Sequence, residues 1–355
     1  MFNVPETMRA VVYRGVNNLQ VETLPVPPTE EDEILVRVAA CGVCPTDIKK
    51  IEHGTLPPPR VFGHETAGRV VRVGARVSGI RLGDRVALHH HVPCLACRSC
   101  RHAAYAQCPQ YKKTGITAGF EPAGGGFAEF VRVMPFVLPG VVPIPDQNSY
   151  IEGAMLEPVN TVLKGINRLG LLRGDRVLVV GQGPIGLMFT RLLRLRGMRV
   201  LATDLLVSRL CTAKEFGATQ TLSGEDPGLA ASFDEFTEGQ GFDAAVLAVP
   251  SDTVLRQTQD FLRGGGKLLI FAHTRREGES PLDLSKVCVD EKDLLGSYSS
   301  DIRLQEEAAR IVFSRKLDVR KLVSHQFSLE ETPQAVALAA KPTLESLKIV
   351  VVQPE

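Results

Sequence analysis

Residues 175–186 decide the fold and read Asp175-Arg-Val-Leu-Val-Val-Gly181-Gln-Gly183-Pro184-Ile185-Gly186. The run of β-branched and aliphatic residues predicts a buried strand, and the glycines after it predict a tight turn into a helix. In such a unit one glycine forms the turn, one lets the backbone approach a pyrophosphate, and one allows the helix to pack on the strand. The helix N-terminus adds partial positive charge at the phosphates. We therefore predict a dinucleotide-binding βαβ unit here.

An acidic residue at the end of the next predicted strand supports this interpretation. Residues 199–204 form a second apolar run that ends at Asp204, where a carboxylate would accept hydrogen bonds from the adenosine ribose hydroxyls. Leu205 and Leu206 follow instead of an arginine, which favours NAD over NADP. Arg209 lies further along the chain and keeps NADP as the alternative.

The two halves of the chain show different patterns. After residue 175, near-continuous apolar runs at 243–249 and 266–271 alternate with predicted helices, as a parallel sheet buried on both faces requires. Before it, residues 8–40 and 61–88 form many short alternating runs bounded by glycine and proline. This second pattern predicts an irregular β barrel or sandwich, which can carry ligands on its loops.

Candidate metal ligands cluster between residues 41 and 65. The chain reads Cys41-Gly-Val-Cys44-Pro-Thr46-Asp47 and, further on, Gly63-His64-Glu65. A thiolate, a neutral imidazole and a carboxylate are zinc ligands, and three protein ligands with one open position make a catalytic zinc site. On these residues alone, a buried core cysteine and a hydrogen-bonded loop histidine explain Cys44 and His64 equally well.

A second cysteine cluster has the spacing C-x2-C-x2-C-x7-C and consists of Cys94, Cys97, Cys100 and Cys108. One loop with these spacings can wrap a tetrahedral ion, and four thiolates leave no open coordination position. We therefore predict a structural zinc, which would serve as the core of a loop with few apolar residues of its own. The alternative is four unligated thiols in an exposed loop.

Composition and charge narrow the class of protein. At 355 residues the chain has room for about two domains. Its formal net charge is +1 and neither sign runs in blocks, so we expect no nucleic-acid partner. No apolar run is as long as a membrane span, and the first residues lack the regions of a signal peptide. Clustered cysteines without a signal favour metal binding and a cytoplasmic location.

Together these motifs resemble the zinc-dependent medium-chain alcohol and polyol dehydrogenases, in particular the sorbitol-dehydrogenase-like branch. The resemblance covers almost the whole chain and includes the segment Leu156-Glu157-Pro158 besides the motifs above. It implies an α/β protein with a GroES-like, β-rich catalytic domain and a doubly wound Rossmann NAD-binding domain. The catalytic domain would comprise residues 1–157 and 298–355, and the Rossmann domain residues 158–297.

The resemblance also implies a set of metal ligands. Cys44 and His64 match ligands of the catalytic zinc. Glu157 matches the third ligand, which is an acid in the sorbitol-like branch, and Glu65 matches a carboxylate that can move onto the metal in place of water. With the four-cysteine loop, two zinc ions per chain are implied, one catalytic and one structural.

Further matches concern the proton and the cofactor. Thr46 matches the hydroxyl that passes the substrate proton, and Asp47 matches the acceptor for the imidazole N–H of His64. Thr161 matches a position beside the nicotinamide, and Lys348 matches one that reaches the cofactor phosphates. The cofactor-binding residues implied in this way are Gly181, Gly183, Pro184, Ile185, Gly186, Asp204, Arg209, Thr161 and Lys348.

The chain departs from the family pattern at two places. Lys49 stands where a histidine often ends the proton relay, and His53 could serve instead. Three consecutive histidines, 89–91, precede the cysteine loop, where the family often has apolar or mixed residues. Either they are exposed at the end of a strand, or one of them, His90, faces the substrate.

The expected reaction interconverts a secondary alcohol and its ketone by hydride transfer from a zinc-bound alkoxide to NAD. Polar pocket candidates favour a polyol, a cyclitol or a sugar as substrate. The alternatives are an L-threonine-type amino-alcohol dehydrogenase, with Glu121 or Glu152 as the ammonium partner, a zinc-free enoyl or quinone reductase, and a non-catalytic nucleotide-binding protein. We expect no membrane partner, and the resemblance suggests a homodimer or homotetramer.

Overall fold

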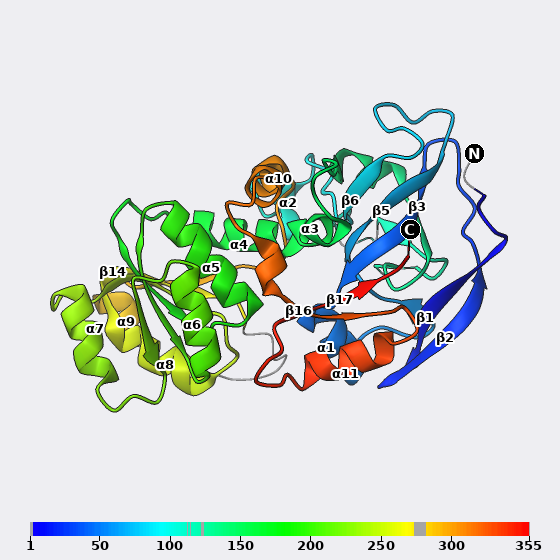
Figure 1. The fold of residues 1–355 in the computed structure, drawn as a ribbon. Coiled ribbons are helices and arrows are strands. Elements are labelled where there is room, and N and C mark those ends of the chain that lie inside the picture. Colours follow the sequence, from blue (N-terminus) through cyan, green and yellow to red (C-terminus); the bar gives the residue numbers. More distant parts are fainter. Residues whose placement is uncertain (1–2, 112, 114, 122–123, 273–281, 355) are drawn as a thin grey trace. The chain divides into compact units, whose positions relative to one another are not determined.

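The computed structural model describes residues 3–111, 113, 115–121, 124–272 and 282–354, and Figure 1 shows its elements. The chain divides into a first unit of residues 1–160 and 301–355 and a second unit of residues 161–300. The predicted domain boundaries, 157/158 and 297/298, lie slightly before these divisions. No helix in the described part of the chain is both long and apolar enough to cross a membrane.

The first unit is built on an eight-stranded sheet. Its main path runs β16 (Val323–Phe327), β17 (Lys348–Val352), β3 (Ile34–Gly42), β5 (Glu65–Val73), β6 (Arg85–His89) and β9 (Val141–Pro143), and β7 (Ile116–Thr117) and β8 (Phe130–Val133) lie off it. Figure 1 shows red β17 beside blue β3, where Val351 is paired with Cys41 in antiparallel register. The last strand of the chain therefore completes the sheet that carries the first metal motif.

A smaller sheet and short helices complete this unit. The smaller sheet has the order β2 (Asn18–Pro25), β1 (Thr7–Gly15) and β4 (Arg60–Val61). Tyr13 and Phe62 pack in its core with their ring centroids 5.3 Å apart. The helices are α1 (Pro45–His53), α2 (Arg98–Arg101), α3 (Tyr150–Ala154), α10 (Gln305–Phe313), α11 (Thr332–Ala340) and the 3₁₀ helices η1 (Tyr105–Gln107), η2 (Pro135–Gly140), η3 (Ile302–Leu304) and η4 (Val319–Leu322). The predicted β-rich architecture is confirmed.

The second unit contains a six-stranded, all-parallel sheet. The strand order is β12 (Gln220–Ser223), β11 (Arg199–Asp204), β10 (Arg176–Val180), β13 (Phe242–Leu247), β14 (Leu262–Ile270) and β15 (Asp293–Gly296). The order reverses at β10, and open parallel sheets bind ligands at the carboxyl ends of the strands beside such a reversal. The predicted doubly wound sheet is confirmed.

Helices cover this sheet, as its apolar strands require. Helices α5 (Pro184–Leu195) and α6 (Val207–Glu215) contact β10, β11 and β12, whereas α8 (Asp252–Phe261) contacts β13 and β14. The remaining helices are α7 (Leu229–Thr237) and α9 (Leu284–Val289), and α4 (Leu156–Leu169) begins in the first unit and continues into the second. Strand residues such as Leu178, Leu201 and Leu268 are at most 1% exposed, which makes the sheet the core of the unit.

Candidate active site

Cys44 is placed by the start of helix α1. It is the N-cap residue, with extended backbone angles, and Pro45 occupies the first turn, where proline fits without losing a hydrogen bond. The Cys44 Sγ accepts a hydrogen bond from the backbone N–H of Thr46 at 3.5 Å. The sulfur therefore lies at the N-terminal end of α1. The side chain is only half-buried, so the sulfur stays accessible to a metal.

His64 is oriented by Asp47. Its Nδ1 lies 3.1 Å from Asp47 Oδ1, and both side chains are buried. Because a carboxylate accepts, Nδ1 carries the proton and the Nε2 lone pair is left for a metal. Burial opposes both charges, but in the metal-free site the two groups stabilise each other: the pKa of Asp47 is lowered, and Asp47 and Cys44 raise that of His64 well above its ordinary value. A metal that binds Nε2 would therefore displace the proton from that nitrogen and leave the one on Nδ1.

Glu65 forms a buried ion pair with Lys348. The Lys348 Nζ lies 2.6 Å from Glu65 Oε1 and 2.5 Å from Oε2, and it also donates to the Val43 carbonyl at 2.9 Å. Although burial opposes its charge, the carboxylate of Glu65 and the Cys44 sulfur raise the pKa of Lys348. The ammonium group is therefore bound to Glu65 and Val43 beside the candidate metal ligands. Its contact with cofactor phosphates stays a prediction.

Three ligand atoms converge at this point. One atom each from Cys44, His64 and Glu65 lie within 4.8 Å of one another. Zinc binds such atoms at about 2.0–2.3 Å, so one ion can bridge a group of this size. The donor set of one thiolate, one imidazole and one carboxylate therefore suits zinc.

Glu157 is not a member of that three-atom group. It lies in the first turn of α4 and is half-buried. Its charge contributes to the raised pKa of Lys348, which places it near the cluster. The structure thus groups Glu65 with Cys44 and His64, and the ranking of Glu157 above Glu65 as a ligand stays a prediction.

One face of α1 carries the residues of the expected proton path. Thr46, Lys49 and His53 are three and then four positions apart, a spacing that places side chains on the same face of a helix. Thr46 and Lys49 are half-buried and His53 is exposed at the last residue of the helix. Burial lowers the pKa of Lys49. These positions lead from the metal motif to solvent.

The three histidines before the cysteine loop are not exposed, so the first of the two sequence interpretations is wrong. His89 and His90 are buried and His91 is half-buried. The His89 Nδ1 donates to Gln305 Oε1 at 3.1 Å, whereas the ring of His90 lies 5.1 Å from the ring of His64, centroid to centroid. Burial lowers the pKa of His89 to about 4 and that of His91 to about 3, and the pKa of His90 is also well below its ordinary value.

The four cysteines of the second motif lie together and form no disulfide. The Sγ atoms of Cys94 and Cys108 are 3.5 Å apart, and those of Cys97 and Cys100 are 3.6 Å apart. Sulfur atoms around a tetrahedral zinc are separated by about 3.8 Å when each Zn–S bond is about 2.3 Å. Burial opposes the Cys108 thiolate, but backbone amides of Cys94 and Tyr111 lower its pKa to about 6. The set fits a closed zinc site.

The glycine-rich turn of the second unit shows why glycine is needed. Gly181 has a φ of +87°, which favours glycine. A Cβ on Gly186 would lie 1.7 Å from the Gly181 carbonyl oxygen, so α5 can pack this closely only without a side chain. A Cβ on Gly183 would meet nothing within 4 Å, which leaves the backbone open on the side where a pyrophosphate would approach.

Asp204 is fixed at the end of β11. Its Oδ2 accepts from the Gln182 amide at 2.6 Å, and its Oδ1 accepts from the Leu206 amide at 2.9 Å. Each oxygen has a second lone pair for a ribose hydroxyl. The Arg209 guanidinium lies 3.9 Å from Oδ2, so Arg209 is nearer to the expected ribose position than its place in the sequence suggested. Thr161, also predicted to face the cofactor, is half-buried in α4.

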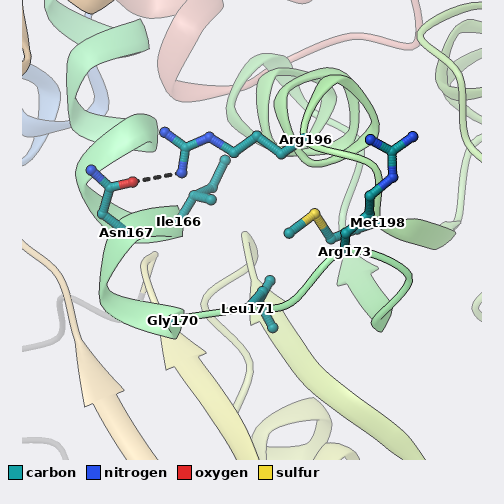
Figure 2. A pocket seen from close by; sticks show the side chains of 7 residues that line it. All are labelled: Ile166, Asn167, Gly170, Leu171, Arg173, Arg196 and Met198. Atoms are coloured by element: carbon teal, nitrogen blue, oxygen red, sulfur yellow. Dashed lines mark hydrogen bonds between the residues drawn. The ribbon is translucent and has the colours of Figure 1, made fainter.

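A cleft of about 340 Å³ lies at the opposite edge of the same sheet (Figure 2). It is lined by the last turn of α4 and by the loops that precede β10 and β11, whereas the glycine-rich turn follows β10. Figure 2 shows the guanidinium of Arg196 extending toward Asn167, to which it donates at 2.5 Å, and that of Arg173 extending to the other side. Because the two charges do not converge, this cleft is not a built anion site.

Comparison with known proteins identifies the family. Residues 30–146 match the family described as Alcohol dehydrogenase GroES-like domain, and residues 184–314 match Zinc-binding dehydrogenase. The sorbitol dehydrogenase of Bacillus subtilis (strain 168) is 30% identical over 354 residues, which cover 98% of each chain. The chain belongs to the zinc-dependent medium-chain dehydrogenases. The predicted family is thereby confirmed.

Two further similarities support this membership. The sorbitol dehydrogenase of Bombyx mori is 29% identical over 347 residues, covering 93% of this medium-chain dehydrogenase and 94% of that protein. A solved structure described as a zinc-binding dehydrogenase from Sinorhizobium meliloti 1021, bound to NADP, superposes with a TM-score of 0.86 at 26% identity and covers 98% and 100% of the two chains. The predicted combination of a GroES-like and a Rossmann domain is confirmed.

Sequence reasoning missed three contacts in this dehydrogenase. They are the Lys348–Glu65 ion pair, the approach of Arg209 to Asp204, and the packing of His90 against His64. The Lys348–Glu65 and His90–His64 contacts join residues far apart in the sequence, so no local sequence pattern predicts them. Arg209 lies in the first turn of α6, five residues after Asp204 at the end of β11, so the short strand-to-helix connection could have indicated that contact.

Proposed function

We propose that this protein is a zinc- and NAD-dependent polyol dehydrogenase that interconverts a secondary alcohol of a polyol, cyclitol or sugar with the corresponding ketone. The convergence of Cys44, His64 and Glu65 beside the hydroxyl-bearing Thr46 carries this proposal. The glycine-rich turn and Asp204 in the second unit supply the features of a dinucleotide site. The similarity to two sorbitol dehydrogenases supports the choice of a polyol.

A zinc ion at Cys44 and His64 would act as a Lewis acid toward the substrate hydroxyl, and bound NAD would accept the hydride. The side chains around the site hold the metal ligands in place. Asp47 keeps the proton on Nδ1 of His64 and so holds Nε2 ready for a metal. Glu157 or Glu65 supplies the third protein ligand, and Lys348 balances the charge of Glu65 when that carboxylate is not on the metal.

The substrate proton leaves through α1. Thr46 accepts it, because its hydroxyl is half-buried next to Cys44 and can both accept and donate a hydrogen bond. Lys49 and His53 follow on the same helix face and lead the proton to solvent. The lowered pKa of Lys49 brings its amine nearer to the range in which it can exchange a proton.

A second zinc at Cys94, Cys97, Cys100 and Cys108 would be structural, because four thiolates leave no position for a substrate. For the cofactor, we favour NAD over NADP. The carboxylate of Asp204 would repel a 2′-phosphate, although the neighbouring Arg209 would attract one.

The contacts of Glu121 and Glu152 argue against an amino alcohol as substrate. Glu152 is buried and accepts hydrogen bonds from Arg315, Ser149 and Asn148, so it has no room for an ammonium group. Glu121 forms an ion pair with Arg132 at 2.7 Å. The metal-ligand group at Cys44 also argues against a zinc-free reductase and against a non-catalytic nucleotide-binding protein.

A panel of polyols, cyclitols and sugars tests the proposal, with NADH formation followed by absorbance and zinc measured on the same samples. We expect turnover of at least one polyol, two zinc ions per chain, and loss of turnover with retained NAD binding in Cys44→Ser. No hydride transfer from any member of the panel to NAD, by protein that holds both zinc and NAD, would overturn the polyol assignment. Only one zinc per chain, held by the cysteine loop, would overturn the catalytic metal.

A further inference from the structure

Four aromatic rings form a continuous stack in the first unit. The ring centroids of His64 and His90 are 5.1 Å apart, those of His90 and His91 are 3.7 Å apart, and those of His91 and Tyr111 are 4.8 Å apart. Successive planes are tilted by 31–42°. The stack begins at a candidate ligand of the catalytic zinc and ends at a residue just beyond the fourth cysteine of the structural site.

The far end of the stack belongs to the core of the cysteine lobe, defined here as residues 94–111. Tyr111 is 2% exposed and packs in one small cluster with Cys100, Tyr105, Ala106 and Cys108. A lobe of this size has little other apolar content, so its order depends on the metal that its thiolates hold. Tyr111 is therefore well placed only when the lobe is folded.

Two hydrogen bonds connect the middle of the stack to residues that follow the lobe. The Nδ1–H of His91 donates to the Lys113 carbonyl at 3.2 Å. The amide of Gly115 donates to the His90 carbonyl at 3.1 Å. A displacement of Lys113 or Gly115 would thus move His91 or His90 as well.

The near end of the stack restrains the His64 ring. The hydrogen bond to Asp47 fixes Nδ1, but a contact at this one atom does not by itself fix the tilt of the ring. Packing of His90 against the ring restricts this tilt, because buried rings in contact cannot move independently. The direction of Nε2 then depends on two supports, one from Asp47 and one from the stack.

We propose that Tyr111 and His91 are positioning residues that couple the cysteine lobe to the catalytic metal site. Folding of the lobe around its zinc fixes Tyr111, the stack transmits this order to His64, and zinc binding at Cys44 and His64 is tightened. The coupling is reciprocal, so zinc at the catalytic site also favours the ordered lobe. This inference rests on the proposed catalytic zinc.

The test compares four variants of the zinc-loaded full chain, three at the tyrosines of the lobe and one at His91. Tyr111→Leu removes the last ring, Tyr111→Phe keeps the ring without its hydroxyl, and Tyr105→Leu is the matched control. Tyr105 belongs to the same lobe cluster, but its ring faces the guanidinium of Arg303 at 4.6 Å instead of a histidine. The dissociation constant of the more weakly held zinc is measured by competition with a chromophoric chelator, with total zinc determined in parallel. The visible absorption of Co²⁺ at the same site reports its geometry.

We expect Tyr111→Leu to weaken zinc binding at the catalytic site about tenfold and to change the Co²⁺ spectrum. Tenfold is the lower end of the usual effect of replacing a residue that supports a metal ligand. Tyr111→Phe and Tyr105→Leu should leave both close to wild type. His91→Leu should reproduce Tyr111→Leu and serves as the second variant if Tyr111→Leu fails to fold. Equal effects of Tyr111→Leu and Tyr105→Leu, or unchanged zinc binding in Tyr111→Leu and His91→Leu, would overturn the coupling alone. A wild-type protein without zinc at Cys44 and His64 would overturn both the coupling and the proposed function.

Discussion

Replacing Lys348 by methionine tests the buried ion pair behind the metal motif. The side chains of Lys348 and Glu65 are only 7% and 2% exposed. Methionine has a similar length but no charge, so the variant loses the contact with Glu65 and the hydrogen bond to the Val43 carbonyl. A buried carboxylate is then left beside the Cys44 sulfur and the Asp47–His64 pair.

The expected cost is large because only one partner of a buried pair is removed. Such changes lower the free energy of unfolding by about 3–5 kcal/mol. For a unit of about 200 residues this corresponds to a decrease in melting temperature of roughly 10 °C. Zinc should reduce the deficit, because a cation at Cys44 and His64 compensates the charge of Glu65 and stabilises the folded state by mass action.

Urea denaturation with and without a zinc chelator measures these quantities, with zinc content determined on the same samples. The double variant Glu65→Gln with Lys348→Met is the control. Replacing both partners removes the unpaired charge, so its unfolding free energy should lie within about 1 kcal/mol of wild type. A single variant as stable as wild type in the metal-free protein would refute the reasoning, and so would a double variant that is as unstable as the single one.

Three further changes probe other parts of the structure. Asp204→Ala should raise the KM for NAD about 10–100-fold, because a charged hydrogen-bond acceptor is lost, and should change kcat much less. Steady-state kinetics that show an unchanged KM for NAD would contradict the assignment of Asp204 to the ribose. Cys97→Ser should release the structural zinc and lower the melting temperature, as metal analysis and calorimetry would show. Glu152→Gln should lower the unfolding free energy by about 1–3 kcal/mol at neutral pH, because Arg315 and Ser149 lose a charged acceptor.

The last change also has a pH signature. Burial opposes the charge of Glu152, but Arg315, Ser149 and Asn148 lower its pKa. A lowered pKa in the folded state contributes stability at pH values above the unfolded pKa of about 4.3, and this contribution is lost as the pH falls through the folded pKa. The difference in stability between wild type and Glu152→Gln should therefore shrink in acid. An equal difference at neutral and acidic pH would show that the carboxylate charge is not the cause.

Features that depend on neighbouring residues were predictable from the sequence. The strand, glycine turn and helix of residues 175–195 follow from local backbone requirements, and Gly181 and Gly186 show those requirements directly. The cysteine lobe is similar, because its spacing brings the four sulfur atoms together within one loop. In both cases the residues that form the feature lie within one short segment of the sequence.

Features that depend on where a strand ends were not predictable in this way. Because side chains alternate along a strand, three consecutive histidines on one strand cannot all converge. His89 does contact Gln305 instead, but β6 ends at His89, so alternation does not separate His90 and His91, whose rings lie 3.7 Å apart. The position of an element's last residue decided the outcome, and element ends are the least certain part of a sequence-based prediction.

Gly42 explains why the ion pair can form between three strands. It pairs with Val350 of β17 on one side and with Glu65 of β5 on the other, so the strands that carry Lys348 and Glu65 meet at this residue. A Cβ at Gly42 would lie 1.9 Å from Glu65 Oε2 and 3.0 Å from Lys348 Cε. The space for both charged groups is therefore created by the absence of one side chain in the central strand. Because Lys348 lies on β17, the buried cluster around Glu65 is complete only when this strand has joined the sheet.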